Sequence, residues 1–196
     1  MNFRNTIKAA MTAGVLSLVL GAPAHAVDVS GVKVDDSATV AGKELKLNGA
    51  GVRTRAVFKV YAMGLYLTDK KTSTADVLSL AGPKRVALHM MREVSSDDLG
   101  QSFVEGLNKN SDKAEKSKIV NQTVKFGEMF ANTAAVKKGD VLTVDWVPGS
   151  GTIVSINGKQ NGDVLPDVAF FNALLKIWLG DSPADSSLKP LLLGGK

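Results

Sequence analysis

The stretch LNGAGVRTRAVFKVYAMGLYL, residues 47–67, decides how the chain folds. Small residues come first, then Arg53 and Arg55, and then an almost unbroken apolar run. Within 56–67 both alternating sets of side chains are mainly apolar, which predicts a long strand covered on both faces. A buried arginine without an anionic partner costs several kcal/mol. We therefore expect a partner for Arg53, either an acidic neighbour at a turn or a bound anion.

The rest of the chain alternates strand and helix patterns, and most of the strands are joined by hairpins. This order predicts an α+β fold, an antiparallel sheet with helices packed on one face. The expected strands are 45–48, 56–67, 84–92, 141–147 and 152–156, and the expected helices are 97–109, 114–132 and 166–179, followed by a short helical segment after Pro183.

The first 26 residues have the pattern of a secretory signal peptide. Arg4 and Lys8 precede the apolar run MTAGVLSLVLGA, and Ala24-His25-Ala26 has the form of a cleavage site. We expect residues 1–26 to be removed and the protein to be periplasmic, with 27–196 as one domain. Loss of two basic residues lowers the formal net charge from +5 to +3. No later stretch is long and apolar enough to span a membrane.

The composition argues against several classes of function. The chain has no cysteine, and His89 is the one histidine beyond the expected signal peptide, so metal sites built on these ligands are not expected. His89 lies in an apolar strand pattern, which favours a packed residue over a catalytic base. The lysines are scattered without stacking aromatic residues, so nucleic acid is not an expected partner. No pattern indicates a cofactor.

Residues 49–53 and 60–67 (GAGVR and VYAMGLYL) resemble the chalcone isomerase family, whose members carry a Gly-rich turn, an arginine and a strand of the type F-x-A-x-G-x-Y-L. The C-terminal half is also similar: VKKGDVLTV at 136–144, a hairpin, a helix opened by Pro166, and an ending of the type G-x-x-P-x-S-x-x-L-K, here Gly180 to Leu188-Lys189. The resemblance covers most of residues 32–193. It implies an open-faced β-sandwich, in which a large antiparallel sheet carries a layer of helices and the ligand cleft lies between them.

The family includes enzymes that cyclise chalcones and non-catalytic relatives that bind fatty acids. The resemblance assigns the family's conserved strand arginine to Arg53, which would meet a phenolate in the enzymes and a carboxylate in the binders. An arginine suits both, because its guanidinium is always charged and offers a bidentate fork. The polar positions of the enzymes correspond here to Tyr61, Leu99, Gly106 and Phe171.

Three hypotheses follow. The first is an exported, non-catalytic protein that binds a small amphipathic carboxylate such as a fatty acid. The second is an isomerase (intramolecular lyase) acting on a chalcone-like phenol, with Arg53 and Tyr61 as catalytic residues. The third is a structural or interaction protein whose cleft has collapsed, with Arg53 in an internal salt bridge. The residues expected to line a ligand site are Arg53, Tyr61, Arg55, Leu99, Phe103 and Phe171. The sequence leaves the ligand, the oligomeric state and the pathway open.

Overall fold

The large sheet of this protein is antiparallel, and its strands follow one another in chain order. The computed structural model describes residues 25–131 and 133–195, so most of the expected signal peptide lies outside the described residues. In those residues seven strands form the large sheet, and a two-stranded hairpin packs separately. The strands are β1 (Ala26–Val29), β2 (Val32–Asp35), β3 (Ser37–Val40), β4 (Lys43–Arg55), β5 (Phe58–Leu67), β6 (Lys84–Met90), β7 (Val141–Val147), β8 (Gly151–Ile156) and β9 (Lys159–Gln160).

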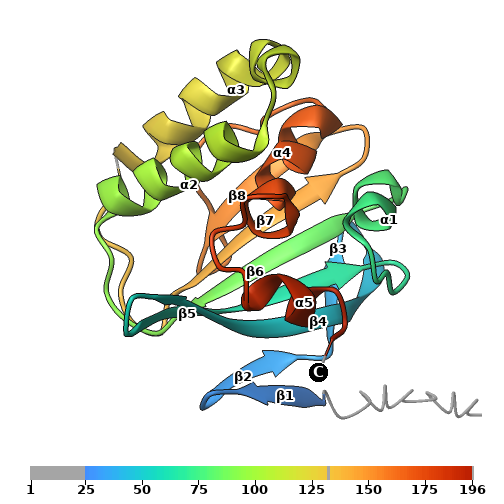
Figure 1. The fold of residues 1–196 in the computed structure, drawn as a ribbon, viewed down its shortest axis with the longest axis vertical. Coiled ribbons are helices and arrows are strands. Elements are labelled where there is room, and N and C mark those ends of the chain that lie inside the picture. The colour runs from blue at the N-terminus through green and yellow to red at the C-terminus, as the bar shows by residue number, and fades with distance from the viewer. Residues whose placement is uncertain (1–24, 132, 196) are drawn as a thin grey trace, which may run out of the picture.

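The helices form a layer on one face of this sheet (Figure 1). They are α1 (Thr74–Ser79), α2 (Ser96–Asn110), α3 (Lys113–Ala131), α4 (Val168–Leu179) and α5 (Leu188–Leu192). The β1–β2 hairpin lies against the opposite face of the sheet (Figure 1). The predicted α+β fold, an antiparallel sheet carrying helices, is confirmed. None of the helices in the described ranges is long and apolar enough to cross a membrane.

Strand β5 is buried on both faces, as its sequence predicts. Met63 and Leu65 belong to the main core beneath the helices. Ala62 and Tyr66 point to the other face and join a second core with the β1–β2 hairpin. The Tyr66 hydroxyl donates a hydrogen bond to the backbone carbonyl of Asp35, 2.9 Å away. The short hairpin thus supplies the second cover that the apolar run requires.

The turn between β4 and β5 differs from the expectation. Strand β4 continues to Arg55, and the turn contains Ala56, whose φ is 53°, and Val57, which is 84% exposed. Both arginines therefore end β4 instead of leading into β5. The apolar residues of the turn resemble a continuation of the strand, which is why the sequence pattern placed the strand start too early.

The other elements follow their local signals closely. Ser95 caps α2, accepting a hydrogen bond from the Asp98 backbone N–H, and Asn157 and Gly158 form the β8–β9 turn with positive φ angles. The β1–β2 hairpin, strands β3 and β9, and helix α1 are not among the expected elements. Each of these elements is short, with two to six residues, and such lengths carry little periodicity.

The C-terminal helix α5 lies directly on β4 (Figure 1). A Cβ at Gly49 would collide with the Leu191 carbonyl, so the approach requires glycine there. The Asn48 side chain donates to the Leu192 carbonyl at 2.7 Å and also bonds to the backbone of Lys71. These contacts fix the C-terminal segment across the sheet.

Lys84, at the start of β6, is 1% exposed, and its Nζ donates a hydrogen bond to the Leu78 carbonyl at 3.2 Å. Burial lowers the pKa of Lys84 from 10.5 to about 8. Between about pH 8 and 10 the unfolded chain holds a proton that folded Lys84 has released, so raising the pH favours the folded state. We predict that the free energy of unfolding rises across this window, by up to about 1.4 kcal/mol per pH unit. Urea denaturation at a series of pH values measures it.

The control for this prediction is Lys84→Met, which should remove the rise. Above pH 10 the trend should reverse, because burial raises the pKa of both Tyr61 and Tyr66 to about 12 and disfavours the ionised phenols that the unfolded chain forms. An equal slope in the wild type and in Lys84→Met would contradict the assignment to Lys84.

Candidate functional site

A cavity of about 390 Å³ opens at the end of the sheet where β4 and β5 meet. Its walls come from the β4–β5 turn, the connection from β6 to α2, and the first two turns of α2. Phe58, Val60, Val94 and Leu99 give it an apolar wall. The charged residues at the cavity are three arginines and two carboxylates: Arg53, Arg55, Arg92, Glu93 and Asp98. A second hollow of about 190 Å³ shares Arg53 and Arg55 and continues toward residues 182–184.

Arg53 lies where these two hollows meet. Its guanidinium stands over the ring of Tyr61, with Cζ 5.6 Å from the ring centroid. Its Nε is buried, and no hydrogen-bond partner for it lies among residues 25–131 and 133–195. No carboxylate in those ranges reaches ion-pair distance of Arg53. Asp185 accepts from the backbone N–H of Thr54 at 2.9 Å. Arg53 therefore presents a charged donor that the described protein does not satisfy.

Tyr61 is fixed beneath Arg53 by a buried hydrogen bond. The Trp178 Nε1–H donates to the Tyr61 hydroxyl oxygen at 2.8 Å, and both side chains are 2% exposed. Burial raises the pKa of Tyr61 to about 12, although the Arg53 charge opposes the shift. The phenol is therefore neutral at physiological pH. Because its oxygen accepts from Trp178, its own proton remains available for a second acceptor.

Of the six residues expected at a ligand site, three line the hollows (Arg53, Arg55 and Leu99), and Tyr61 and Phe103 are core residues that line neither hollow. Arg55 lines both hollows, and Leu99 lines the larger one. Phe103 is buried and meets Trp178 edge-on, with ring centroids 5.9 Å apart. Phe103 thus supports the site from below.

Phe171 is not part of this group. Its ring packs against Trp146, with centroids 6.1 Å apart, and Trp146 pairs with Lys84. Tyr61 pairs with Met90, at the opposite end of β6. Phe171 is therefore a core residue at the far end of the sheet from Arg53.

Two residues at the site were missed by sequence reasoning. Trp178 lies 117 residues from its partner Tyr61, and no local pattern connects them. Arg92 follows a strand and stands over the ring of Phe58, with Cζ 4.8 Å from the centroid. A basic residue at a strand end is a common surface feature, so only the fold identifies Arg92 as part of the cavity.

The space deeper between the sheet and the helices is filled by side chains. Phe103 and Phe126 meet at 5.7 Å and Phe126 and Phe170 at 5.7 Å, and all three are at most 3% exposed. The open volume therefore lies at the end of the sheet and does not extend through the core.

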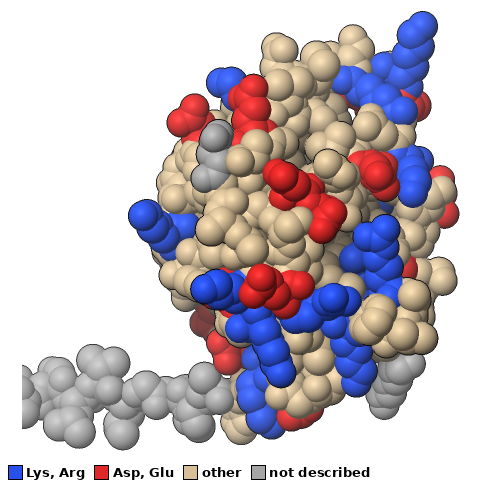
Figure 2. Space-filling view, turned by 90° about the vertical axis from the view of Figure 1, so that its left-hand side faces the viewer, with Lys and Arg blue, Asp and Glu red and all other residues tan. Residues whose placement is uncertain are grey.

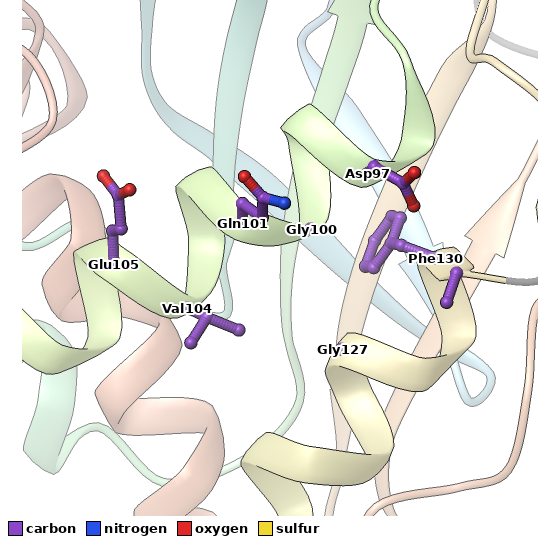
Figure 3. A pocket seen from close by; sticks show the side chains of 8 residues that line it. Asp97, Gly100, Gln101, Val104, Glu105, Gly127 and Phe130 are labelled. Atoms are coloured by element: carbon purple, nitrogen blue, oxygen red, sulfur yellow. The ribbon is translucent and has the colours of Figure 1, made fainter.

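A larger hollow, of about 450 Å³, lies between helices α2 and α3 on the outer side of the helix layer (Figure 3). Gly100 and Gly127 leave this space, and Asp97 and Glu105 lie at its edge. No lysine or arginine lines it, so it lacks the chemistry to hold an anion. No group of three or more potential metal ligands gathers anywhere in the described part of the chain.

A family model described as chalcone isomerase-like matches residues 26–194. The chain belongs to the chalcone isomerase-like family. Among solved structures, a fatty-acid binding protein of Arabidopsis thaliana has the same fold, with a TM-score of 0.67 and 16% sequence identity. The match covers 87% of this chain and 97% of the plant protein. A search of curated proteins found no significant match.

The bond between Tyr61 and Trp178 gives a direct test of the site's internal support. Tyr61→Phe leaves a buried indole N–H without an acceptor, which costs about 1–3 kcal/mol. We predict a loss of this size in the free energy of unfolding, measured by urea denaturation.

Tyr66→Phe is the matched control, on the same strand but the opposite face. Its hydroxyl donates to a backbone carbonyl in a partly buried place, so the predicted loss is about 1 kcal/mol or less. Adding Trp178→Phe to Tyr61→Phe should show coupling between the two residues. If the losses of unfolding free energy in Tyr61→Phe and Trp178→Phe simply add in the double variant, the hydrogen bond does not stabilise the fold as predicted.

Proposed function

We propose that this chalcone isomerase-like protein binds a small amphipathic carboxylate, such as a fatty acid, and does not catalyse a reaction on it. The observation that carries this proposal is Arg53, which lines a cavity and whose buried Nε has no partner among the described residues. A cation in such a place is unfavourable unless an anion joins it.

The head of the ligand would lie between Arg53 and Arg55. A carboxylate accepts two parallel hydrogen bonds from one guanidinium, which is the strongest common form of this contact. Tyr61 is buried and lines neither hollow, so its part would be to support the Arg53 guanidinium through its ring. Both arginines line both hollows, so a head group there leaves either hollow open for the rest of the molecule.

The tail would lie in the cavity beside the β4–β5 turn, along Val60, Val94 and Leu99. Its volume of about 390 Å³ falls within the usual ~300–1,000 Å³ of small-molecule sites. The fatty-acid binding protein of the same fold supports the choice of a fatty acid as the test ligand.

The surroundings of Arg53 favour binding over catalysis. Cyclisation of a chalcone needs polar groups that hold water and fix the geometry of attack. At the positions that correspond to such groups, Leu99 is apolar and Gly106 packs against Ile177, where even a Cβ would approach to 2.8 Å. Tyr61 remains, but its oxygen is engaged by Trp178.

We further propose that the protein is exported to the periplasm. The basic start, the apolar run and the Ala24-His25-Ala26 site support it. N-terminal sequencing of the protein from the periplasmic fraction should give Val27 as the first residue. Intact Met1 on protein from the cytosol would contradict export, without bearing on the cavity.

Arg53→Ala should weaken the binding of a fatty acid by about 2 kcal/mol or more, because charge-assisted hydrogen bonds in a desolvated site are in the strong range. Arg53→Lys should restore only part of this loss, because the bidentate fork is missing. Calorimetric titration with a fatty acid measures the dissociation constants, and native mass spectrometry detects a ligand that co-purifies.

Lys43→Ala is the matched control, because it removes one positive charge at the other end of β4. Binding should be unchanged in this variant. Equal affinity in the wild type and Arg53→Ala would remove the proposed anchor. Turnover of a chalcone above the spontaneous rate, abolished by Arg53→Ala, would assign isomerase activity instead.

A further inference from the structure

The β4–β5 turn carries two of the most exposed large apolar side chains of the described residues. Val57 is 84% exposed and Phe58 is 56% exposed. Apolar residues at the tip of a hairpin contribute nothing to either core cluster, and water is an unfavourable surrounding for them. An exposed apolar tip of this kind is expected where the tip inserts into another apolar environment, such as a membrane or a partner's surface.

Basic side chains surround this tip. Arg55 and Lys59 flank it on the two strands, and both are exposed. Arg92 reaches over the Phe58 ring from the neighbouring connection. Two exposed apolar side chains are thus flanked by three basic side chains at one end of the molecule.

The basic region extends to the next loop. The turn before β7 bonds to the end of β6, with the Gly139 N–H donating to the Met90 carbonyl at 2.9 Å. This turn carries Lys137 and Lys138, both exposed. Figure 2 faces this end of the molecule and shows lysine and arginine side chains gathered in its lower half, with acidic side chains among and above them.

Two acidic residues of this end accept hydrogen bonds within the fold. Asp98 accepts from the Ser95 hydroxyl at the start of α2, and Asp140 accepts from the Lys137 backbone N–H and the Asn157 side chain. Glu93, next to Arg92, is exposed and lines the same cavity as Phe58 and Arg92, so one carboxylate stands at this rim. Five basic residues, Arg55, Lys59, Arg92, Lys137 and Lys138, are exposed at this end, so positive charge outweighs it.

We propose that the β4–β5 tip docks on the surface of an anionic phospholipid bilayer. Val57 and Phe58 enter the boundary between head groups and acyl chains, and Arg55, Lys59 and Arg92 contact the phosphates. This is the combination that holds a peripheral protein at a membrane surface, since apolar insertion and attraction to anionic lipids add to each other. A nucleic acid would use the cations but would gain nothing from an exposed valine at the tip.

The docking surface is also the rim of the cavity. Arg55, Phe58 and Arg92 belong to both. Docking would bring the mouth of the cavity to the lipid surface, where an amphipathic acid can exchange without crossing water. The docking itself concerns the outer surface and holds whether or not the cavity is occupied.

Vesicle co-sedimentation tests the proposal, with protein as purified from cells and the same N-terminus in every variant. The probes are vesicles of phosphatidylcholine alone and of phosphatidylcholine mixed with phosphatidylglycerol. The wild type should bind the mixed vesicles more strongly, and salt should weaken the binding. Val57→Ser with Phe58→Ser should lower the partition coefficient about tenfold or more, and so should Arg55→Gln with Lys59→Gln.

Two control pairs make the same chemical change elsewhere. Val120→Ser with Val124→Ser removes two exposed valines from α3, and Lys43→Gln with Lys46→Gln removes two charges from the other end of β4. The partition coefficients of both pairs should stay within about twofold of the wild type, since neither pair touches the tip.

The variant Phe58→Trp tests insertion directly. On binding to the mixed vesicles, the added indole should show a blue-shifted emission and quenching by brominated lipid.

Several results would overturn the proposal. Unchanged binding in the Val57→Ser/Phe58→Ser variant would exclude insertion of the tip. An equal loss in the α3 control pair would assign the binding to general surface hydrophobicity. A short DNA duplex that displaces the protein from the vesicles, with no tryptophan shift on vesicle binding, would make the surface an electrostatic site for nucleic acid.

Discussion

The hydrogen bond from Trp178 to Tyr61 is the contact on which the candidate site depends. It joins α4 to β5 within the core, at a place that excludes water from both partners. The bond fixes the tyrosine ring, and the ring in turn supports the guanidinium of Arg53 at 5.6 Å. It also occupies the hydroxyl oxygen, which leaves the tyrosine as a donor. A single buried bond therefore fixes the ring over which the Arg53 guanidinium stands.

The two ends of the sheet differ because different loops close them. At the far end, α1 covers Lys84 and Trp146 packs against Phe171, so side chains fill the space between sheet and helices. Along β4, helix α5 sits so close that Gly49 cannot be replaced by a larger residue without displacing backbone. At the end that carries Arg53, the β4–β5 turn and the start of α2 leave a hollow beside the sheet. This end of the sheet is open because neither α1 nor Trp146 and Phe171, which fill the far end, lie there.

Local sequence signals predicted most of the secondary structure and the cover on both faces of β5. They worked because each signal involves neighbours in the chain, such as the Ser95 cap or the Asn157-Gly158 turn. The resemblance to the family identified Arg53, Tyr61 and Leu99, which the fold brings together. Trp178 and Arg92 were not predicted, because their partners are distant in sequence or lie on another strand. Phe171 was assigned by alignment to a site from which the sheet separates it.

The arginines of this protein show how structural and unsatisfied cations differ. Arg85 forms two 2.6 Å hydrogen bonds with Asp145 on the adjacent strand, and these bonds raise its pKa. Arg53, Arg55 and Arg92 sit at one end of the sheet, and no ion pair within residues 25–131 and 133–195 involves them. Stability alone would favour pairing or removing the charge of Arg53, since an unpaired, partly buried cation is a cost, whereas Arg55 and Arg92 are exposed to solvent. Arg85 thus stabilises the sheet through its pairing with Asp145, while Arg53 contributes no ion pair to the described fold.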